Sequence, residues 1–193
     1  SIWYDQSGNS KDAIQNTEAS QPRIVNTGVL DNDGSKASLY FSGTNELSIS
    51  SFTSILSVLN SYSVFTVHNL NNSIGTVFRS SISTNNRFSI NYTADQKISF
   101  QAYNGSFFSK TTNLSSRKRI LSSLFFSPNT MTSYVDTVVS ADTVLTGGTS
   151  ATASTTIGTG FLNTIQEIII YPSNLSSSRT AIELNINNFY NIF

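Results

Sequence analysis

The sequence predicts a single all-β domain, a sandwich of two antiparallel sheets with one short C-terminal helix. Three observations support this class. Val, Ile, Phe and Tyr supply most of the apolar residues, and such side chains suit a pleated, half-buried strand. Ser, Thr and Asn, which close turns, are abundant, whereas charged residues make up only 11% of the 193 residues. Segments of alternating polar and apolar residues also recur along the chain with turn signals between them.

The predicted strands follow one another in order and are bounded by Gly, Pro, Asn, Asp or Ser. They cover residues 23–25, 37–41, 45–50, 63–68, 75–82, 87–92, 97–103, 120–126, 131–139 and 165–171. A tight turn is expected at 31–34 and a hairpin turn at 127–130. The strand at 165–171 is so apolar that we expect it to be buried on both faces. Residues 146–159, rich in Gly, Thr, Ser and Ala, predict a flexible loop or a weak edge strand.

One helix is expected, near the C-terminus. Ser176–Ser178 supply capping side chains, and Glu183 stands in an early turn. Four apolar residues then recur at helical spacing. They are Ile182, Ile186, Phe189 and Tyr190. We expect this helix to pack over one edge or end of the sandwich.

The length suits one domain that covers residues 1–193. Because the chain opens at Ser1 without Met, we expect it to be a piece of a longer protein. A net charge of zero argues against nucleic acid as a partner, and no apolar run is long enough to insert into a membrane. The single cationic run, Arg117–Arg119, is interpreted as a solvated loop end, with an anion site as the alternative.

The sequence lacks the residue patterns of common hydrolases, so we predict that the domain is not an enzyme. The absence of cysteine excludes thiol nucleophiles and thiolate metal sites. His68 is the only histidine, and no G-x-S-x-G segment is present, which argues against a serine triad. Glu167 stands alone in an apolar strand, whereas glycosidases need two carboxyl groups close together.

A polar face is predicted on three successive strands, 75–82, 87–92 and 97–103. Side chains alternate between the two sides of a sheet, which places one polar set on one side. The candidate carbohydrate-binding residues are Arg79, Arg87, Asn91, Gln101 and Tyr103, with Phe107 in the adjoining loop 104–108 as a stacking platform. Amides and guanidinium groups bind sugar hydroxyls, and aromatic rings stack on sugar faces. The alternative is an ordinary solvated outer face of the sandwich.

Both ends of the chain resemble a known family of domains. The opening W-Y-D-Q-S-G-N at 3–9, Asp12-Ala13, Gln21-Pro22 and K-A-S-L-Y-F-S-G at 36–43 are similar to the start of concanavalin A-like/laminin-G-like jelly-roll domains. The ending E-I-I-I-Y at 167–171 and Leu175-Ser176 resembles the end of that family. Such domains are common in bacterial surface proteins and in the tail or head-fibre proteins of phages, notably those of Bacteroidota hosts.

The resemblance implies a two-sheet jelly roll that acts outside the cell, at a cell surface or on a virion. It implies sugar binding, adhesion or structural spacing, but no particular ligand, because one fold hosts many functions. We therefore expect a non-catalytic, lectin-like module that binds a cell-surface glycan. The alternative is a structural or assembly module of a virion or surface fibre that binds only protein partners. No cofactor is expected, although Asp5, Asn9 and Asp12 form a candidate calcium site.

Overall fold

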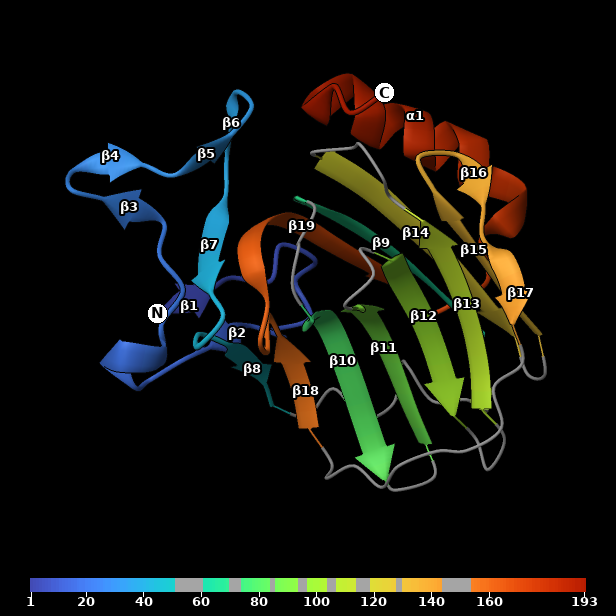
Figure 1. Cartoon of the computed structure of the whole chain (residues 1–193), viewed down its shortest axis with the longest axis horizontal. Helices are drawn as coiled ribbons and strands as arrows, with labels where there is room; N and C mark the ends of the chain where they lie inside the picture. The colour runs from blue at the N-terminus through green and yellow to red at the C-terminus, as the bar shows by residue number, and fades with distance from the viewer. Residues whose placement is uncertain are drawn as a thin grey trace.

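The protein is a sandwich of two antiparallel sheets with one helix against the outer side of one sheet (Figure 1). The structure is a computed structural model. It describes residues 1–50, 61–69, 74–83, 86–93, 97–103, 107–113, 119–127, 130–143 and 154–193. The predicted fold class is therefore confirmed.

The larger sheet, called here sheet A, contains nine strands. In spatial order these are β1 (Ile2–Trp3), β2 (Ala13–Ile14), β8 (Leu47–Ile49), β18 (Ser154–Ile157), β10 (Gly75–Ser83), β11 (Asn86–Tyr92), β12 (Lys97–Tyr103), β13 (Phe107–Asn113) and β17 (Ala141–Thr143). Strands β10 to β13 are consecutive in the sequence and adjacent in space. The three strands of the predicted polar face are thus neighbours.

The smaller sheet, sheet B, contains six strands. Its order is β16 (Val138–Val139), β15 (Thr130–Val135), β14 (Arg119–Ser127), β9 (Tyr62–Asn69), β19 (Leu162–Tyr171) and β7 (Leu39–Ser42). Two small hairpins stand apart from both sheets. They are β3 (Val25–Asn26) with β4 (Val29–Leu30), and β5 (Asn32–Asp33) with β6 (Lys36–Ala37). Short 3-10 turns occupy Glu18–Ser20 and Ser176–Ser178, and the helix α1 spans Arg179–Tyr190.

The main core lies between the sheets and is rich in aromatic side chains. Tyr62 and Phe126 of sheet B stack with ring centroids 4.9 Å apart, and Phe88 of sheet A meets the Tyr62 ring edge-on at 5.6 Å. All three are fully buried. Aromatic pairs in such arrangements add to the free energy gained by burying their area. These contacts therefore join the two sheets at the centre of the domain.

The helix packs on the outer face of sheet B and not, as predicted, over an edge or end of the sandwich (Figure 1). Its Ile186 is buried with Phe65 and Phe125, which point away from the main core. Apolar residues on this outer face of the sheet need a cover, and the apolar stripe of the helix supplies it. The predicted capping role of Ser178 is wrong, because its side chain caps no backbone N–H group.

The buried Glu183 fixes the helix on sheet B. Its Oε1 accepts a hydrogen bond from Ser123 Oγ on β14 at 2.8 Å, and its Oε2 lies 2.5 Å from Arg179 Nη1. Burial raises the pKa of Glu183, while Ser123 and Arg179 act in the opposite direction. The helix therefore carries a polar anchor beside its apolar contacts.

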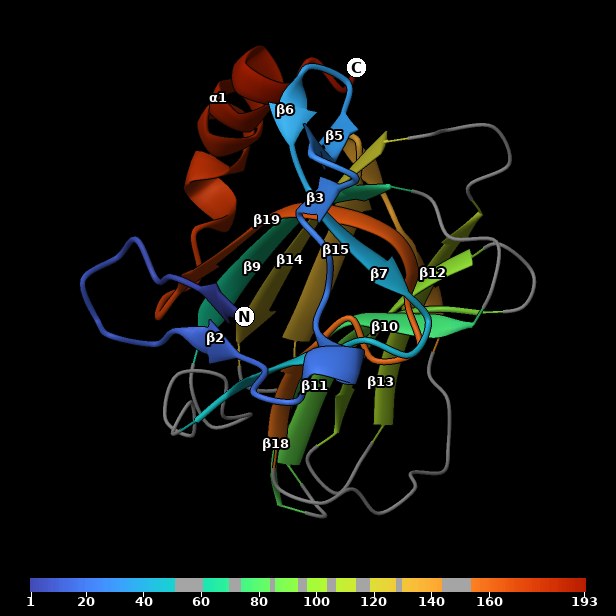
Figure 2. The ribbon, with the colours of Figure 1, turned by 90° about the vertical axis from the view of Figure 1, so that its left-hand side faces the viewer.

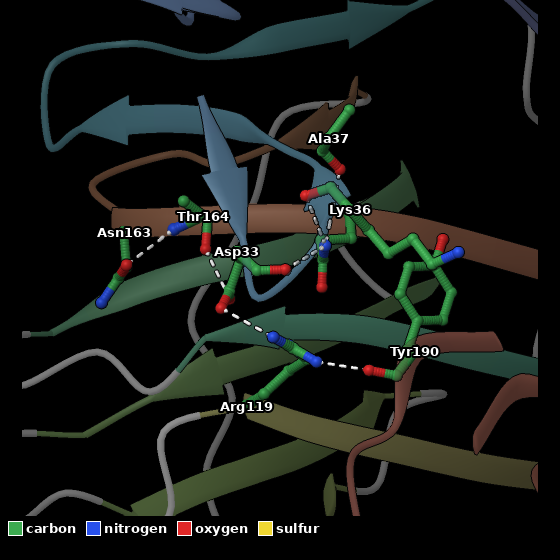
Figure 3. Close-up of polar contacts among 8 residues, drawn as sticks. Asp33, Lys36, Ala37, Arg119, Asn163, Thr164 and Tyr190 are labelled. Carbon is green, nitrogen blue, oxygen red and sulfur yellow. Dashed lines mark hydrogen bonds and ion pairs between the residues drawn. The ribbon is translucent and has the colours of Figure 1, made fainter. Parts of the chain in front are cut away.

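Arg119 is not the solvated loop residue that was predicted. It lies at the start of β14, where its Nη2 is 3.2 Å from Asp33 Oδ1 and its Nη1 donates to the carbonyl oxygen of Tyr190 (Figure 3). Thr164 Oγ1 donates to the other oxygen of Asp33 at 3.0 Å. The pair thus links the β5–β6 hairpin, sheet B and the end of the helix. Arg117 and Lys118 lie outside the described residues.

Several boundaries differ from those predicted. The segment 131–139 is two strands, because Asp136 and Thr137 have positive φ angles and form a turn between β15 and β16. The weak edge strand expected in 146–159 is β18, whose described part is paired on both sides, by β8 and β10. The tight turn at 31–34 joins β5 to β6, with Gly34 at φ +63°. Pro128 and Asn129 of the predicted hairpin turn lie outside the described residues.

Candidate functional site: the polar face of sheet A

The polar face is the outer side of β10, β11 and β12, where pairing aligns the candidate residues in three rows, one of which pairs Asn91 with Ser99. In one row, Arg79 pairs with Ser89, which pairs with Gln101. In the next row, Arg87 pairs with Tyr103. Directly paired residues on neighbouring antiparallel strands lie close enough for their side chains to interact. The helix packs on the other sheet and not on this face.

A chain of side-chain hydrogen bonds crosses the polar face. Thr76 Oγ1 donates to Asn91 Oδ1 at 2.9 Å, and Asn91 Nδ2 donates to Ser89 Oγ at 2.8 Å. Ser89 Oγ donates in turn to Gln101 Oε1 at 3.4 Å, and Gln101 Nε2 donates to Ser99 Oγ at 3.2 Å. The two serines are buried, whereas Asn91 and Gln101 remain half-buried. These hydrogen bonds therefore hold the amides of Asn91 and Gln101 in defined orientations on the surface.

Arg79 adds a guanidinium group to this face. It is half-buried, and its Nε is buried without a hydrogen-bond partner. Its strand partners are Ser89 on β11 and Thr156 on β18, which carry no charge. A buried donor without a partner costs free energy, and such a group in a native structure requires an explanation. The described residues leave this donor unused.

The structure fixes only the backbone positions of Arg87, Tyr103 and Phe107. Tyr103 pairs with Arg87 on one side and with Phe107 on the other, so the three positions form a row across β11, β12 and β13. The prediction that Phe107 lies in a loop is wrong, because β13 begins at that residue. Residues 104–106 of the predicted loop lie outside the described residues.

Val77 does not belong to the polar face, although simple alternation with Arg79 would place it there. The pairing of β10 with β11 shifts register between Thr76 and Phe78, which places a bulge at Val77. A bulge inserts one extra residue and breaks the alternation. Val77 is fully buried in the core as a result, beside Phe78.

The candidate calcium residues form a turn held by its own hydrogen bonds. Asp5 Oδ1 accepts from Ser7 N at 2.8 Å, Asp5 Oδ2 accepts from Lys11 N at 3.0 Å, and Asp12 Oδ1 accepts from Asp5 N at 2.8 Å. A hydrogen bond from the Ser7 side chain and these N–H groups lower the pKa of Asp5. The carboxylates of Asp5 and Asp12 thus accept hydrogen bonds that close the turn. Calcium binding with Asn9 stays a prediction.

His68 lies in the core between the sheets. Its ring is fully buried, its Nδ1 is 3.1 Å from Thr66 Oγ1, and it meets the Tyr92 ring edge-on at 5.6 Å. Burial lowers the pKa of His68 to about 3, so the ring is neutral at physiological pH. The sole histidine is therefore a buried residue of β9 and has no access to a substrate.

Sequence reasoning missed a cavity of about 510 Å³ at one edge of the sandwich. It lies between the N-terminal segment and β19, and Trp3, Ile49, Phe78 and Gln166–Ile170 contribute to its lining. Trp3 is partly buried and packs against the main core beside this cavity. Because the cavity forms where two sheet edges meet, no local sequence signal marks it.

Comparisons with known proteins identify the fold. No protein-family model matches the chain, and no curated protein matches its sequence. Among solved structures, the binding domain of Paraclostridial Mosquitocidal Protein 1 has a TM-score of 0.66 at 10% identity over 97% of this chain. The mouse laminin α1 domains LG4-5 give 0.56 at 11% identity over 72% of it. The chain has the laminin-G-like jelly-roll fold.

A third structure with this jelly-roll fold contains a bound sugar. The CBM40 domain of the Ruminococcus gnavus IT-sialidase, bound to α2,3-sialyllactose, has a TM-score of 0.57 at 10% identity. The match covers 76% of this chain and 96% of that one. By contrast, the chain spans 44% of the laminin structure and 50% of the mosquitocidal binding domain.

Among the described residues, no helix has the length and apolar character needed to cross a membrane.

Proposed function

We propose that this jelly-roll domain is a non-catalytic module that binds a cell-surface glycan at the polar face of sheet A. The observation that carries the proposal is Arg79, whose buried Nε lacks a partner beside amides that a hydrogen-bond chain holds in place. A guanidinium group and two oriented amides supply the donors and acceptors that sugar hydroxyl groups bind. The sialyllactose bound by the CBM40 domain supports this class of ligand for the fold.

The proposed site lies on the outer face of a sheet and relies on a few hydrogen-bonding groups, so we expect weak binding by a single domain and stronger binding by several linked copies. Adhesion at a bacterial or virion surface, outside the cell, is the setting in which such multivalent binding operates. That setting belongs to the proposal. The rival function, an assembly module that binds only protein partners, is supported by a separate feature at the edge of sheet B.

A glycan array probed with a multimerised domain tests the proposal. Wild-type protein should bind a defined set of glycans, and Arg79→Met and Gln101→Ala should each lose that binding while keeping the strand-rich circular dichroism spectrum. Arg23→Met is the matched control, because Arg23 is exposed on another surface and pairs with Asp31. Loss of glycan binding in Arg23→Met, or its survival in both face variants, would contradict the assignment of the site.

A further inference from the structure

Among the described residues, none pairs as a strand with one edge of β19 over half its length. On one side it pairs with β9 from Ile165 to Tyr171, whereas on the other side β7 pairs only with Leu162–Ile165. Within the described part of the chain, no strand pairs with the β7 side of Gln166–Tyr171. Unpaired N–H and C=O groups along a strand edge are a template for pairing with another chain.

The edge cavity lies directly beside these unpaired residues. Five consecutive residues of β19, Gln166–Ile170, line it, and Trp3, Ile49 and Phe78 line it as well (Figure 2 shows this side of the molecule). Ile168 and Ile170 belong to the core cluster but are only partly buried, in contrast to residues 62–68 of the adjacent β9, which are all buried. This contrast shows that β19 lacks a neighbour that β9 has. It also corrects the prediction that 165–171 is buried on both faces.

The cavity also contains a buried polar atom without a partner. Gln166 is 9% exposed, and its Nε2 donates to the carbonyl oxygens of Asp33 and Lys36 at 3.1 and 3.2 Å. Its Oε1 is buried and accepts no hydrogen bond. Gln166, which lines the cavity, is therefore held against the β5–β6 hairpin with one acceptor unused.

We propose that this edge of β19 receives an extended peptide segment of a partner protein as an additional antiparallel or parallel strand. The peptide main chain would pair with the β19 edge, and alternate apolar side chains would enter the cavity between the sheets. Strand addition of this kind takes its affinity from main-chain hydrogen bonds and its specificity from pockets for alternate side chains. Five residues of strand provide a platform of about 17 Å.

The unpaired main chain of the edge favours a peptide, because a peptide can pair with it along its length. The cavity beside it combines apolar side chains from both sheets, such as Ile49, Phe78 and Ile168, with polar ones from the N-terminal turn, Asp5, Gln6, Ser7, Asn9 and Lys11. Proteins usually protect an edge with Lys, Pro or a bulge; here the protection is limited to a register shift at Gln166 and the charge of Glu167, and proline follows only at Pro172. The peptide site is on a different surface from the glycan site and does not depend on it.

Trp3, the only tryptophan, provides a direct signal because it lines the cavity. The probe is a soluble peptide of about nine residues in which Val and Thr alternate. Its two controls are the same residues arranged as a Val block and a Thr block, and the alternating peptide with N-methyl groups on every second amide. We expect the alternating peptide to shift Trp3 emission and to protect amides of residues 166–170 from hydrogen exchange, and both controls to fail.

Substitutions in the protein test whether the peptide binds at this edge of β19. Ile168→Lys should weaken peptide binding about tenfold or more, since a charge would enter the apolar space. Leu184→Lys is the matched control, because Leu184 is exposed on the helix and should leave binding unchanged. If Ile168→Lys fails to fold, the N-methylated peptide on wild-type protein still provides the test.

Three results would overturn the proposal. The N-methylated peptide could bind as well as its parent, which would remove the role of main-chain pairing. The amides of residues 166–170 could gain no protection when Trp3 emission shifts. The protein could also dimerise through this edge, with dimers lost in Ile168→Lys, which would assign the edge to a second copy of the chain. Loss of glycan binding in Arg79→Met bears on the other site only.

Discussion

Arg119 and Asp33 form an ion pair across 86 residues of sequence, with Nη2 and Oδ1 3.2 Å apart and both side chains mostly buried. Asp33 also accepts a hydrogen bond from Thr164, and Arg119 also donates to the backbone of Tyr190 (Figure 3). The pair therefore joins a hairpin near the N-terminus to the central strands of sheet B and to the C-terminal helix. Removing one partner leaves the other charge in a site with little solvent.

Arg119→Met is expected to lower the free energy of unfolding by about 1–3 kcal/mol, because Asp33 loses its charged partner. Urea denaturation followed by circular dichroism measures the change. Arg23→Met is the control, since the Arg23–Asp31 pair is more exposed and should matter less. Equal loss of stability in both variants would show that the burial of the Arg119 pair has no consequence.

Gly158→Ala is expected to destabilise the fold by about 1–3 kcal/mol through a clash with Phe41. A Cβ at Gly158 would lie 2.1 Å from two atoms of the buried Phe41 ring, and the residue has φ +82°. Gly8→Ala separates the two causes, because Gly8 has nearly the same φ, +80°, and open space around it. Thermal unfolding should show a larger loss for Gly158→Ala, and similar losses would exclude the clash as the cause.

Stability should fall as the pH drops below about 6.5, because His68 is buried in its neutral form. Its pKa is about 3 in the folded protein and near 6.5 in the unfolded chain, so acid protonates the unfolded state first. Between pH 6.5 and 4.5 this linkage costs about 2–3 kcal/mol of unfolding free energy. The stability it contributes is fully present above pH 6.5.

His68→Leu should flatten this pH dependence, and denaturant titrations at several pH values measure it. Burial raises the pKa values of Glu167 and Glu183, which makes the folded state bind protons more readily and acts in the opposite direction. Both glutamates remain in the variant, so the difference between the two proteins isolates His68. An unchanged slope in His68→Leu would show that the ring is accessible to protons in the folded state.

Arg79→Lys should retain only part of any glycan affinity, and Arg79→Met should lose most of it. A planar guanidinium presents several donors in a fixed geometry, whereas an ammonium group is a mobile point charge. A charge-assisted hydrogen bond contributes about 1.5–3 kcal/mol, so the Met variant should bind about ten- to a hundredfold more weakly. Surface plasmon resonance on the immobilised glycan, repeated at higher salt, measures both variants. If Arg79→Lys binds the glycan as tightly as wild-type protein, Arg79 acts through its charge alone.

The alternation of polar and apolar residues predicted most of the central strands, because both sheets have one face on a shared core. The strands Arg87–Tyr92 and Lys97–Tyr103 lie almost where the pattern placed them, as β11 and β12. The helix was equally clear from its apolar spacing. Such local signals follow directly from side-chain geometry, so they can be read without knowledge of the partners.

Features that depend on distant segments could not be predicted. The role of Arg119 follows from Asp33, and the position of Val77 in the core follows from a register shift between β10 and β11. For the candidate site, the sequence predicted which residues share a face, and the structure adds the hydrogen-bond chain and the unpartnered Nε of Arg79. The edge cavity depends on the meeting of Trp3 with β19, which no local pattern encodes.

The position of β19 within sheet B constrains how the domain is made. This strand lies between β9 and β7, although it follows both by many residues in the sequence. On the ribosome, β7 and β9 leave the exit tunnel early. The strand between them, β19, is translated after all the other described strands. Native pairing of such distant segments is slow, and exposed strand edges invite aggregation meanwhile. We therefore expect nascent chains that end before β19 to depend on chaperones.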